Sequence, residues 1–485
     1  MKKIFITILS IAILFGTGCD SIDFGDTNKN VNGPADASTS ALLSGAITEF
    51  STRTGRPYRL TPTLNVQYLM QLVYNSEMLY ADNVGYWERY YVQVLSNLQE
   101  VINVCSDPEN QGNPIITANG ALENQIAVAK IFKSVVFKRV TDLFGNVPYS
   151  EALNPEILLP KYDSQEDIYK SMINEVKAAR DMIDVSKAGP TGDVIYGGDM
   201  EMWQKFANSF LVSLGMQVTK ADIALAEATV TEALNSSLGV LESVDEDAIY
   251  TFDVANGFDN PWNWMRPADY GVTAELISAM KGNGFTSNST FDNRLKYIVD
   301  DTADEGLPYG YKDYGDGTSA NVNSIIIAAD TKLPLLTSAY TYLHRAEAAA
   351  RGWTSEDAGE MLKKGIENSY ARGTALYGIE IGDGAAYADA RVADMATAPG
   401  GALQVIGEEK WVTLFPQGYD AWSEWRRTDY PKLTPAADAI NSGQIPRRYN
   451  YPEDEPSLNT AGYNEGVAGL TPASDNNTSR FWWDK

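Results

Sequence analysis

Apolar residues recur at helical spacing along most of the chain after residue 40. In the stretch 121–140 they line one face and also fill much of the remaining circumference, which predicts a helix buried on several sides. Gly145 and Pro148 end this helix, because glycine permits a left-handed turn and proline cannot continue the helical hydrogen bonding. Further helices are predicted at 64–80 and 87–104.

Local capping signals and paired periodic stretches predict helical hairpins. Ser164 and Asp167 form a capping box at the start of a helix that extends to Ile183. Two antiparallel helix pairs are predicted next, 202–218 with 222–235 and 334–351 with 354–371, with Thr354 and Asp357 placed as the N-terminal cap of the last helix. Pairs of this length are typical of tetratricopeptide repeats, although no strict repeat period is present. The sequence therefore predicts a mostly α fold, a tetratricopeptide-like superhelix of helical pairs.

The stretch from about 240 to 333 differs from the rest. Glycine, asparagine, aspartate, proline and aromatic residues dominate it, and it lacks a helical period. Segments of this length without regular periodicity are usually functional loops. We predict a loop-rich insert on the ligand side, with a few short strands, two of them at 248–253 and 323–328.

The amino terminus carries an export signal. Lys2 and Lys3 precede an apolar run, 4–15, that is long enough for a secretory signal and too short to span a bilayer. Small residues lead to Cys19, which predicts a lipoprotein signal peptide at 1–18 and a lipidated tether at 19–39, followed by a helical domain at 40–485. Plain secretion with an incidental Cys19 remains the alternative. Only Cys105 is then left, so no intramolecular disulfide is expected.

Charge narrows the possible partners. The 485-residue chain has a formal net charge of -26, which argues against nucleic acid or an anionic membrane face because both require clustered lysine and arginine. Neutral and cationic ligands remain compatible with this charge.

Catalytic motifs are sparse. His344 is the single histidine, so the chain lacks the residues of a multi-histidine zinc site. Neither a nucleophile elbow nor a phosphate-binding loop is present, which argues against a serine or cysteine hydrolase and against a nucleotide-binding enzyme. We expect no catalytic residues, no metal ligands and no cofactor. Paired carboxylates leave a surface glycoside hydrolase as a less favoured reading, since the sequence does not give their separation.

Four motifs in order carry a family resemblance. RVTDLFGNVPYSEAL, EKWVTLFPQGYDAWSEWRRTDYP, PRRYNYPEDE and the terminal WWDK resemble signatures of the SusD/RagB family, surface nutrient-binding lipoproteins of glycan-using bacteria. One departure is SFLVSLGMQV, where relatives often carry basic residues. The tryptophans of these motifs are expected to pack in the core, and Arg426 and Arg427 to pair with acidic groups.

The resemblance implies a function. It indicates a lipid-anchored protein on the outer face of the outer membrane that binds an oligosaccharide and delivers it to a SusC-like TonB-dependent transporter, without acting as an enzyme. Peptide capture by the same architecture is the alternative.

Aromatic residues with polar neighbours in loops are the candidate ligand contacts. Sugar rings pack on indole and phenol rings while amides, carboxylates and guanidinium groups bond the hydroxyls. Trp87 and Trp264 could instead fill the core. The predicted ligand-binding residues are Tyr80, Asp82, Asn83, Tyr86 and Trp87 in a first region, Trp262, Asn263, Trp264 and Arg266 in a second, and Tyr309 and Tyr311, with Tyr314, in a third.

Overall fold

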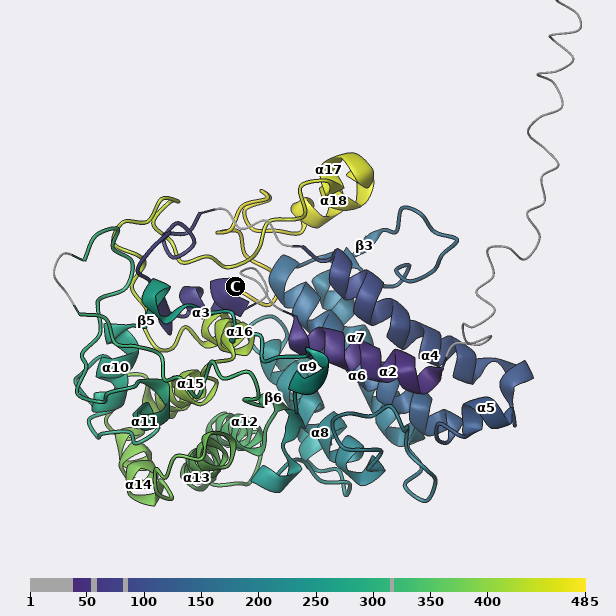
Figure 1. Cartoon of the computed structure of the whole chain (residues 1–485), viewed down its shortest axis with the longest axis horizontal. Helices are drawn as coiled ribbons and strands as arrows, with labels where there is room; N and C mark the ends of the chain where they lie inside the picture. Colours follow the sequence, from purple (N-terminus) through teal and green to yellow (C-terminus); the bar gives the residue numbers. More distant parts are fainter. Residues whose placement is uncertain (1–37, 54–58, 82–85, 315–317) are drawn as a thin grey trace, which may run out of the picture. The chain divides into compact units, whose positions relative to one another are not determined.

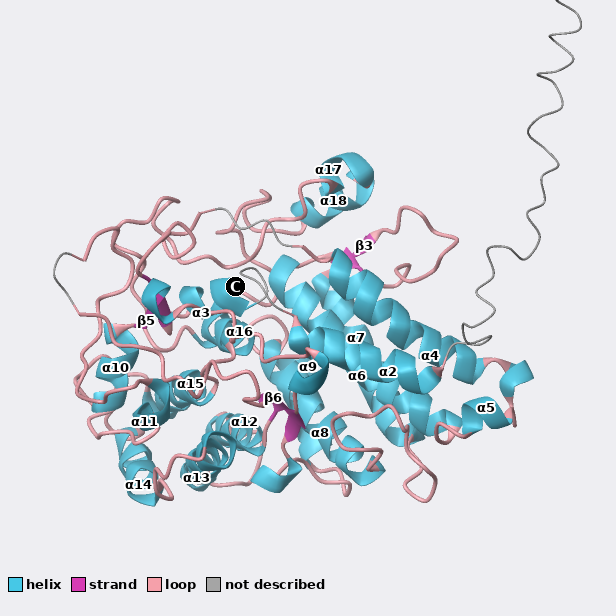
Figure 2. Ribbon diagram, viewed as in Figure 1, coloured by secondary structure: helices cyan, strands magenta, loops and turns pink. Residues whose placement is uncertain are grey.

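The computed structural model describes residues 38–53, 59–81, 86–314 and 318–485. The predicted signal peptide and Cys19 lie outside these residues. Helices dominate the described part of the chain (Figure 2), which confirms the mostly α fold. In that part, no helix is both long and apolar enough to cross a bilayer. The segments are, in order, α2 (Thr39–Thr52), α3 (Thr61–Asn65), β1 (Leu69–Gln71), η3 (Tyr90–Leu95), α4 (Ser96–Ser106), η4 (Pro108–Asn110), α5 (Pro114–Thr117), α6 (Leu122–Phe144), β2 (Val147–Pro148), β3 (Tyr162–Asp163), α7 (Gln165–Met182), α8 (Met200–Gln217), α9 (Ile223–Leu234), η5 (Val244–Glu246), β4 (Ala248–Tyr250), η6 (Val254–Asn256), η7 (Pro267–Asp269), β5 (Tyr270–Val272), α10 (Ala274–Lys281), α11 (Leu295–Ile298), β6 (Leu333–Leu336), α12 (Ser338–Ala350), α13 (Ala358–Tyr377), α14 (Ala385–Asp394), α15 (Gly401–Thr413), α16 (Gly418–Thr428), α17 (Glu455–Leu458) and α18 (Thr460–Ala468).

Consecutive helices pack as hairpins, and the hairpins stack on one another (Figure 1). α6 packs against α7, α8 against α9 and α12 against α13, while α7 contacts α8 and α12 contacts α15. The two predicted pairs are therefore confirmed. Two predicted caps are present: Asp167 N–H donates to Ser164 Oγ at 3.1 Å at the start of α7, and Glu360 N–H donates to the Asp357 side chain at 2.8 Å at the start of α13. The prediction that Thr354 shares the second cap is wrong, because α13 begins only at Ala358 and Thr354 Oγ1 has no hydrogen-bond partner among the described residues.

The carboxy terminus packs against the end of the central helix α6. Gly145, with φ of 90°, terminates this helix, and a Cβ there would lie 2.9 Å from the Phe481 ring. The Trp483 indole is fully buried and donates to Asp142 Oδ1 at 3.1 Å. The first of the four motifs, RVTDLFGNVPYSEAL, therefore packs directly against the last, WWDK.

The predicted helix at 64–80 is wrong. α3 ends at Asn65, and β1 follows and pairs with β5, which lies about 200 residues later in the chain. Positive φ angles at Gln67, Tyr74 and Tyr80 turn the backbone out of a helical path. Apolar spacing alone could not reveal a strand whose partner is so distant.

A second correction concerns the strand predicted at 323–328. The strand predicted at 248–253 exists as β4, but its partner is β6, Leu333–Leu336, and residues 323–328 form turns. α12 therefore begins at Ser338, after β6, rather than at Pro334. Pairing with β4 keeps the chain before α12 extended.

A buried charge cluster joins α12, α15 and α16. Lys410 Nζ donates to Glu347 Oε2 at 2.6 Å and lies 2.8 Å from His344 Nδ1. Burial and the nearby Lys410 charge lower the pKa of His344 well below its ordinary value, so the ring accepts this hydrogen bond as a neutral group. Arg427 bonds Glu347 and Glu424, as predicted for this arginine. Burial opposes ionisation of Glu424, yet the Arg427 and Lys410 charges lower its pKa to about 2.

Arg426, by contrast, does not pair with an acidic side chain. Its Nη1 donates at 2.7 Å to the backbone carbonyls of Asp142 and Arg447, and its guanidinium lies 4.1 Å from the Trp422 ring centroid. The expectation of an acidic partner is wrong here because carbonyl oxygens and a ring face fill the donor positions.

A second buried cluster ties the segment between α10 and α11 to α14 and α15. Arg294 Nη2 lies 2.7 Å from both Asp292 Oδ2 and Glu409 Oε2. Arg391 of α14 bonds Glu409 at 2.8 Å and Glu408 at 2.9 Å. Since an unpaired buried charge costs several kcal/mol, these contacts fix where the loop-rich segment attaches to the helices.

Asp247 is buried next to the start of α12. Ser338 N–H donates to its Oδ1 at 2.6 Å, whereas Oδ2 has no hydrogen-bond partner among the described residues. Burial raises the pKa of Asp247 to about 6, against the lowering influence of Arg372. The folded protein therefore holds this proton more tightly than the unfolded chain, and stability falls as pH rises from about 4 to 6.

We expect Asp247→Asn to raise the free energy of unfolding at pH 8 by about 1–3 kcal/mol, because a neutral amide avoids the cost of a buried carboxylate. Most of the gain should be lost by about pH 4, because the folded carboxyl is then protonated and the unfolded one partly so. Urea unfolding at the two pH values measures this. The exposed neighbour provides the control, since Asp245→Asn should change stability by less than about 0.5 kcal/mol. A variant less stable than wild type at pH 8 would contradict the prediction.

Candidate functional site

Exposed aromatic side chains gather on loops around the β1–β5 pair. The two strands are antiparallel, with Leu69 opposite Val272 and Gln71 opposite Tyr270. Leu72 N–H extends the ladder by donating to the Asp269 carbonyl at 2.8 Å. Loops predominate in this part of the chain (Figure 2). The small sheet thus brings the segment after β1 beside the segment before β5.

Tyr74 and Tyr311 project from two of these loops. Tyr74 is 72% exposed and its φ is +54°, which turns its side chain out of the β1 direction. The neighbouring Asn75 Nδ2 donates to the Lys312 carbonyl at 3.1 Å, and this bond joins the two loops. Tyr311 is 42% exposed, with its ring centroid 6.2 Å from that of Tyr314.

Trp264 projects from the third loop, just before β5. Its ring stands edge-on to Tyr270 of that strand, with centroids 6.3 Å apart, and the side chain is 36% exposed. Asn263 and Arg266 beside it are exposed, and the Arg266 guanidinium lies 3.5 Å from Asp269. We name the exposed side chains Tyr74, Trp264 and Tyr311 the aromatic surface.

Two predicted residues, Tyr80 and Tyr309, lie beneath this surface and hold the loops. Tyr309 donates from its hydroxyl to the Met78 carbonyl at 3.1 Å, and Ala436 N–H donates to the Tyr80 hydroxyl at 2.9 Å. Both rings are buried, with centroids 6.4 Å apart. Burial raises the pKa of Tyr80 to about 12. Tyr80 and Tyr309 therefore support the loops and do not contact a ligand, because neither ring is exposed to solvent.

The remaining predicted residues are dispersed. Trp87 is buried against Phe144 and Tyr162, with ring centroids 5.1 and 5.5 Å away, and Trp262 is also buried. Tyr86 is exposed. Asp82 and Asn83 lie outside the described residues.

Tyr74 was not among the residues predicted from the sequence. The predicted helix at 64–80 concealed it, since a tyrosine within an apolar helix is expected to pack. The Asn75-Ser76 pair after it is a turn signal that could have exposed the error. Its exposure depends on β1 being a strand, which the sequence pattern did not indicate.

The arrangement suits noncovalent binding. Ring faces on rigidly held loops stack on apolar faces of a ligand, and the amide and guanidinium groups nearby bond hydroxyl groups. Among the described residues, no group of three or more histidine, cysteine or acidic side chains is placed to hold a metal ion. His344 is buried in the charge cluster, so its ring does not contribute to the chemistry of the surface.

Comparison with known proteins gives a consistent assignment. The family of SusD-like proteins, described as starch-binding and associating with the outer membrane, matches residues 31–452. A solved chitin-binding protein is 26% identical, with 92% of this chain and 100% of that chain covered and a TM-score of 0.76. No curated protein sequence matches the chain.

Two further structures share the fold. A chitin-binding SusD homologue from Flavobacterium johnsoniae is 23% identical over 92% of this chain and 98% of that chain, with a TM-score of 0.74. A SusD homologue from Bacteroides fragilis is 22% identical over 93% and 100%, with a TM-score of 0.75. With the family match covering most of the residues, the chain belongs to the SusD-like family, whose tetratricopeptide-containing helical fold it has.

Proposed function

We propose that this protein is a lipid-anchored protein of the outer-membrane surface that binds an oligosaccharide through the aromatic surface and passes it to a SusC-like TonB-dependent transporter. The observation that carries the proposal is the exposure of Tyr74, Trp264 and Tyr311 on loops joined by the β1–β5 pair and by the hydrogen bond from Asn75 to the Lys312 carbonyl. Rings held in this way lose little conformational freedom when a ligand binds.

The comparisons support a saccharide over a peptide. The family description refers to starch, and the relative at 26% identity is a chitin-binding protein. A peptide ligand receives no support from either. Chitin oligosaccharides are therefore the first ligands to test, followed by starch oligosaccharides.

The same family supports binding rather than hydrolysis. SusD-like proteins are binding proteins, so the proposal contains no bond-breaking step. Delivery to the transporter and the lipid anchor at Cys19 are parts of the proposal that follow from the family resemblance. Residues 1–18 would be removed as a signal peptide, and 19–39 would form the tether.

We expect Tyr74→Ala, Trp264→Ala and Tyr311→Ala each to weaken binding of chitohexaose about tenfold, about 1.4 kcal/mol, because each removes one stacking face. Isothermal titration with chitohexaose and maltohexaose measures the loss. Phe291→Ala is the matched control, since Phe291 is 42% exposed like Tyr311 but lies on the loop between α10 and α11. If all three variants bind as wild type does, another surface holds the ligand.

We expect Cys19→Ala to move the protein from the membrane fraction to the soluble fraction, because two or three acyl chains anchor firmly and the unmodified chain lacks them. Fractionation followed by mass measurement of the mature protein tests this. Cys105→Ala, at a buried position in α4, should remain in the membrane fraction. Retention of the Cys19→Ala protein on washed membranes would show that something other than this lipid anchors it.

A further inference from the structure

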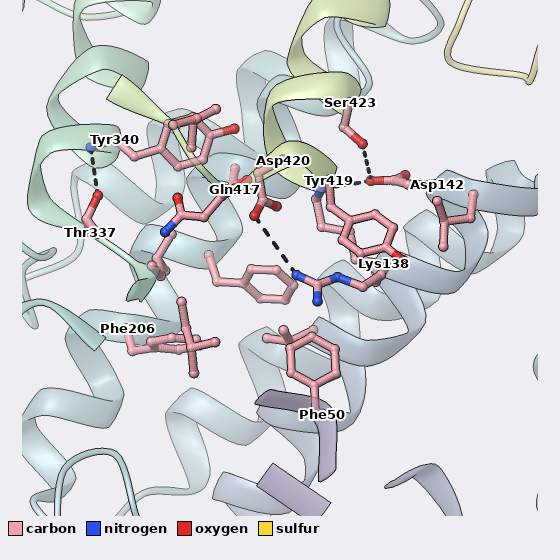
Figure 3. Close-up of a pocket in the computed structure, with 18 residues that line it drawn as sticks. Phe50, Lys138, Asp142, Phe206, Thr337, Tyr340, Gln417, Tyr419, Asp420 and Ser423 are labelled. Atoms are coloured by element: carbon pink, nitrogen blue, oxygen red, sulfur yellow. Dashed lines mark hydrogen bonds and ion pairs between the residues drawn. The ribbon is translucent and has the colours of Figure 1, made fainter. Parts of the chain in front are cut away.

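The helical body contains two adjoining cavities that the proposed function does not use. The larger has a volume of about 60 Å³ and lies among α2, α6, α8 and α16; the smaller, of about 30 Å³, continues from it toward β6. Arg139, Gln417, Tyr419 and Asp420 line both. Figure 3 shows Phe50 of α2 approaching the larger cavity from one helix and Tyr419 and Asp420 of α16 from another.

Arg139 occupies the junction of the two cavities with its donors unused. Its guanidinium carbon lies 4.3 Å from the Phe50 ring centroid and 4.6 Å from that of Tyr419, so the group is held between two ring faces. It makes no hydrogen bond to any described residue, and its nearest carboxylate oxygen, Asp420 Oδ2, is 4.0 Å away. Only 14% of the side chain is exposed. A guanidinium group this buried normally has its five N–H donors bonded.

Positive charge exceeds negative charge around the cavities. Lys138 and Asp142 neutralise each other at 2.8 Å. Arg59 lines the smaller cavity, and it donates hydrogen bonds to the backbone carbonyls of Arg53 and Ser51. Asp420 is therefore the single carboxylate in the described lining that remains to balance Arg59 and Arg139.

The two arginines affect each other. Burial and the charge of Arg139 together lower the pKa of Arg59 to about 10. Buried like charges of this kind are costly unless a counter-charge lies between them. The exposed Lys332 at the smaller cavity adds a further positive charge.

Size restricts what can enter. A water molecule needs roughly 10–15 Å³ measured in this way, so about 60 Å³ holds a few waters or one group of similar bulk. A sugar ring is too large. A carboxylate fits, and the planar guanidinium fork of arginine matches two carboxylate oxygens.

We propose that this cavity binds a small monovalent carboxylate such as acetate or formate, held by the guanidinium of Arg139 between Phe50 and Tyr419. The anion would neutralise the excess positive charge and receive the donors that no described residue takes. The site is independent of the aromatic surface, which lies on loops around β1 and β5, so the two proposals stand or fall separately.

Isothermal titration with sodium acetate tests the proposal, with ionic strength held constant by sodium HEPES, whose anion is too large for the cavity. Saturable binding is expected in the wild-type protein. Arg139→Gln should weaken it at least about tenfold, because the charged fork is lost. Arg89→Gln, at an exposed arginine, is the control and should leave acetate binding unchanged.

The decisive variant is Asp420→Asn, which should tighten acetate binding about tenfold, because it removes the one negative charge that repels the anion. Structural damage would weaken binding, so the direction of the change separates the electrostatic account from a folding defect. Wild-type crystals soaked in sodium bromide supply an independent reading, with an anomalous peak expected beside the Arg139 guanidinium. Absence of saturable acetate binding, or weaker binding after Asp420→Asn, would overturn the proposal.

Discussion

Three consecutive charged residues in the middle of α15, Glu408, Glu409 and Lys410, are all buried. A helix that presents charges on several faces cannot be surrounded by apolar side chains, because each unpaired buried charge costs several kcal/mol. Each of the three therefore needs a charged partner from a neighbouring element. α12 and α16 supply Glu347 and Glu424 for Lys410, while α14 and the segment before α11 supply arginines for the two glutamates.

This constraint reaches the loop-rich segment through Arg294. The loop-rich segment from about 240 to 333 has few helices of its own, and Arg294 clamps it to Glu409 of α15. β5 of this segment pairs with β1 at a second point, and the Tyr309 hydroxyl donates to the Met78 carbonyl at a third. Loops held at three points can present rings in fixed positions despite their length. The exposed aromatic residues thus depend on a charge cluster that does not touch them.

Much of the scaffold could be predicted because its determinants are local. The spacing of apolar residues and the caps at Ser164 and Asp357 act within one or two helical turns, and the hairpins α8–α9 and α12–α13 follow from them. β1 could not be predicted, since its strand character comes from pairing with β5 about 200 residues away. The same reason explains the site. Trp87 is buried because of partners distant in sequence, Phe144 and Tyr162, which Trp264 lacks, and nothing in the immediate neighbours of the two tryptophans distinguishes them.

The net charge of the chain can be read from its composition, whereas the local charge inside the cavities depends on the fold. A formal net charge of -26 sets a repulsive potential for anions at the surface, screened over roughly 8–10 Å at physiological salt. Inside, Arg59, just before α3, and Arg139 of α6 line adjoining cavities in which positive charge is in excess, opposite in sign to the net charge of the chain. An anion that reaches Arg139 must therefore cross a repulsive field before it meets an attractive one. Its association should then be accelerated by salt, because screening lowers the outer barrier while the buried contacts, shielded from solvent, are screened much less.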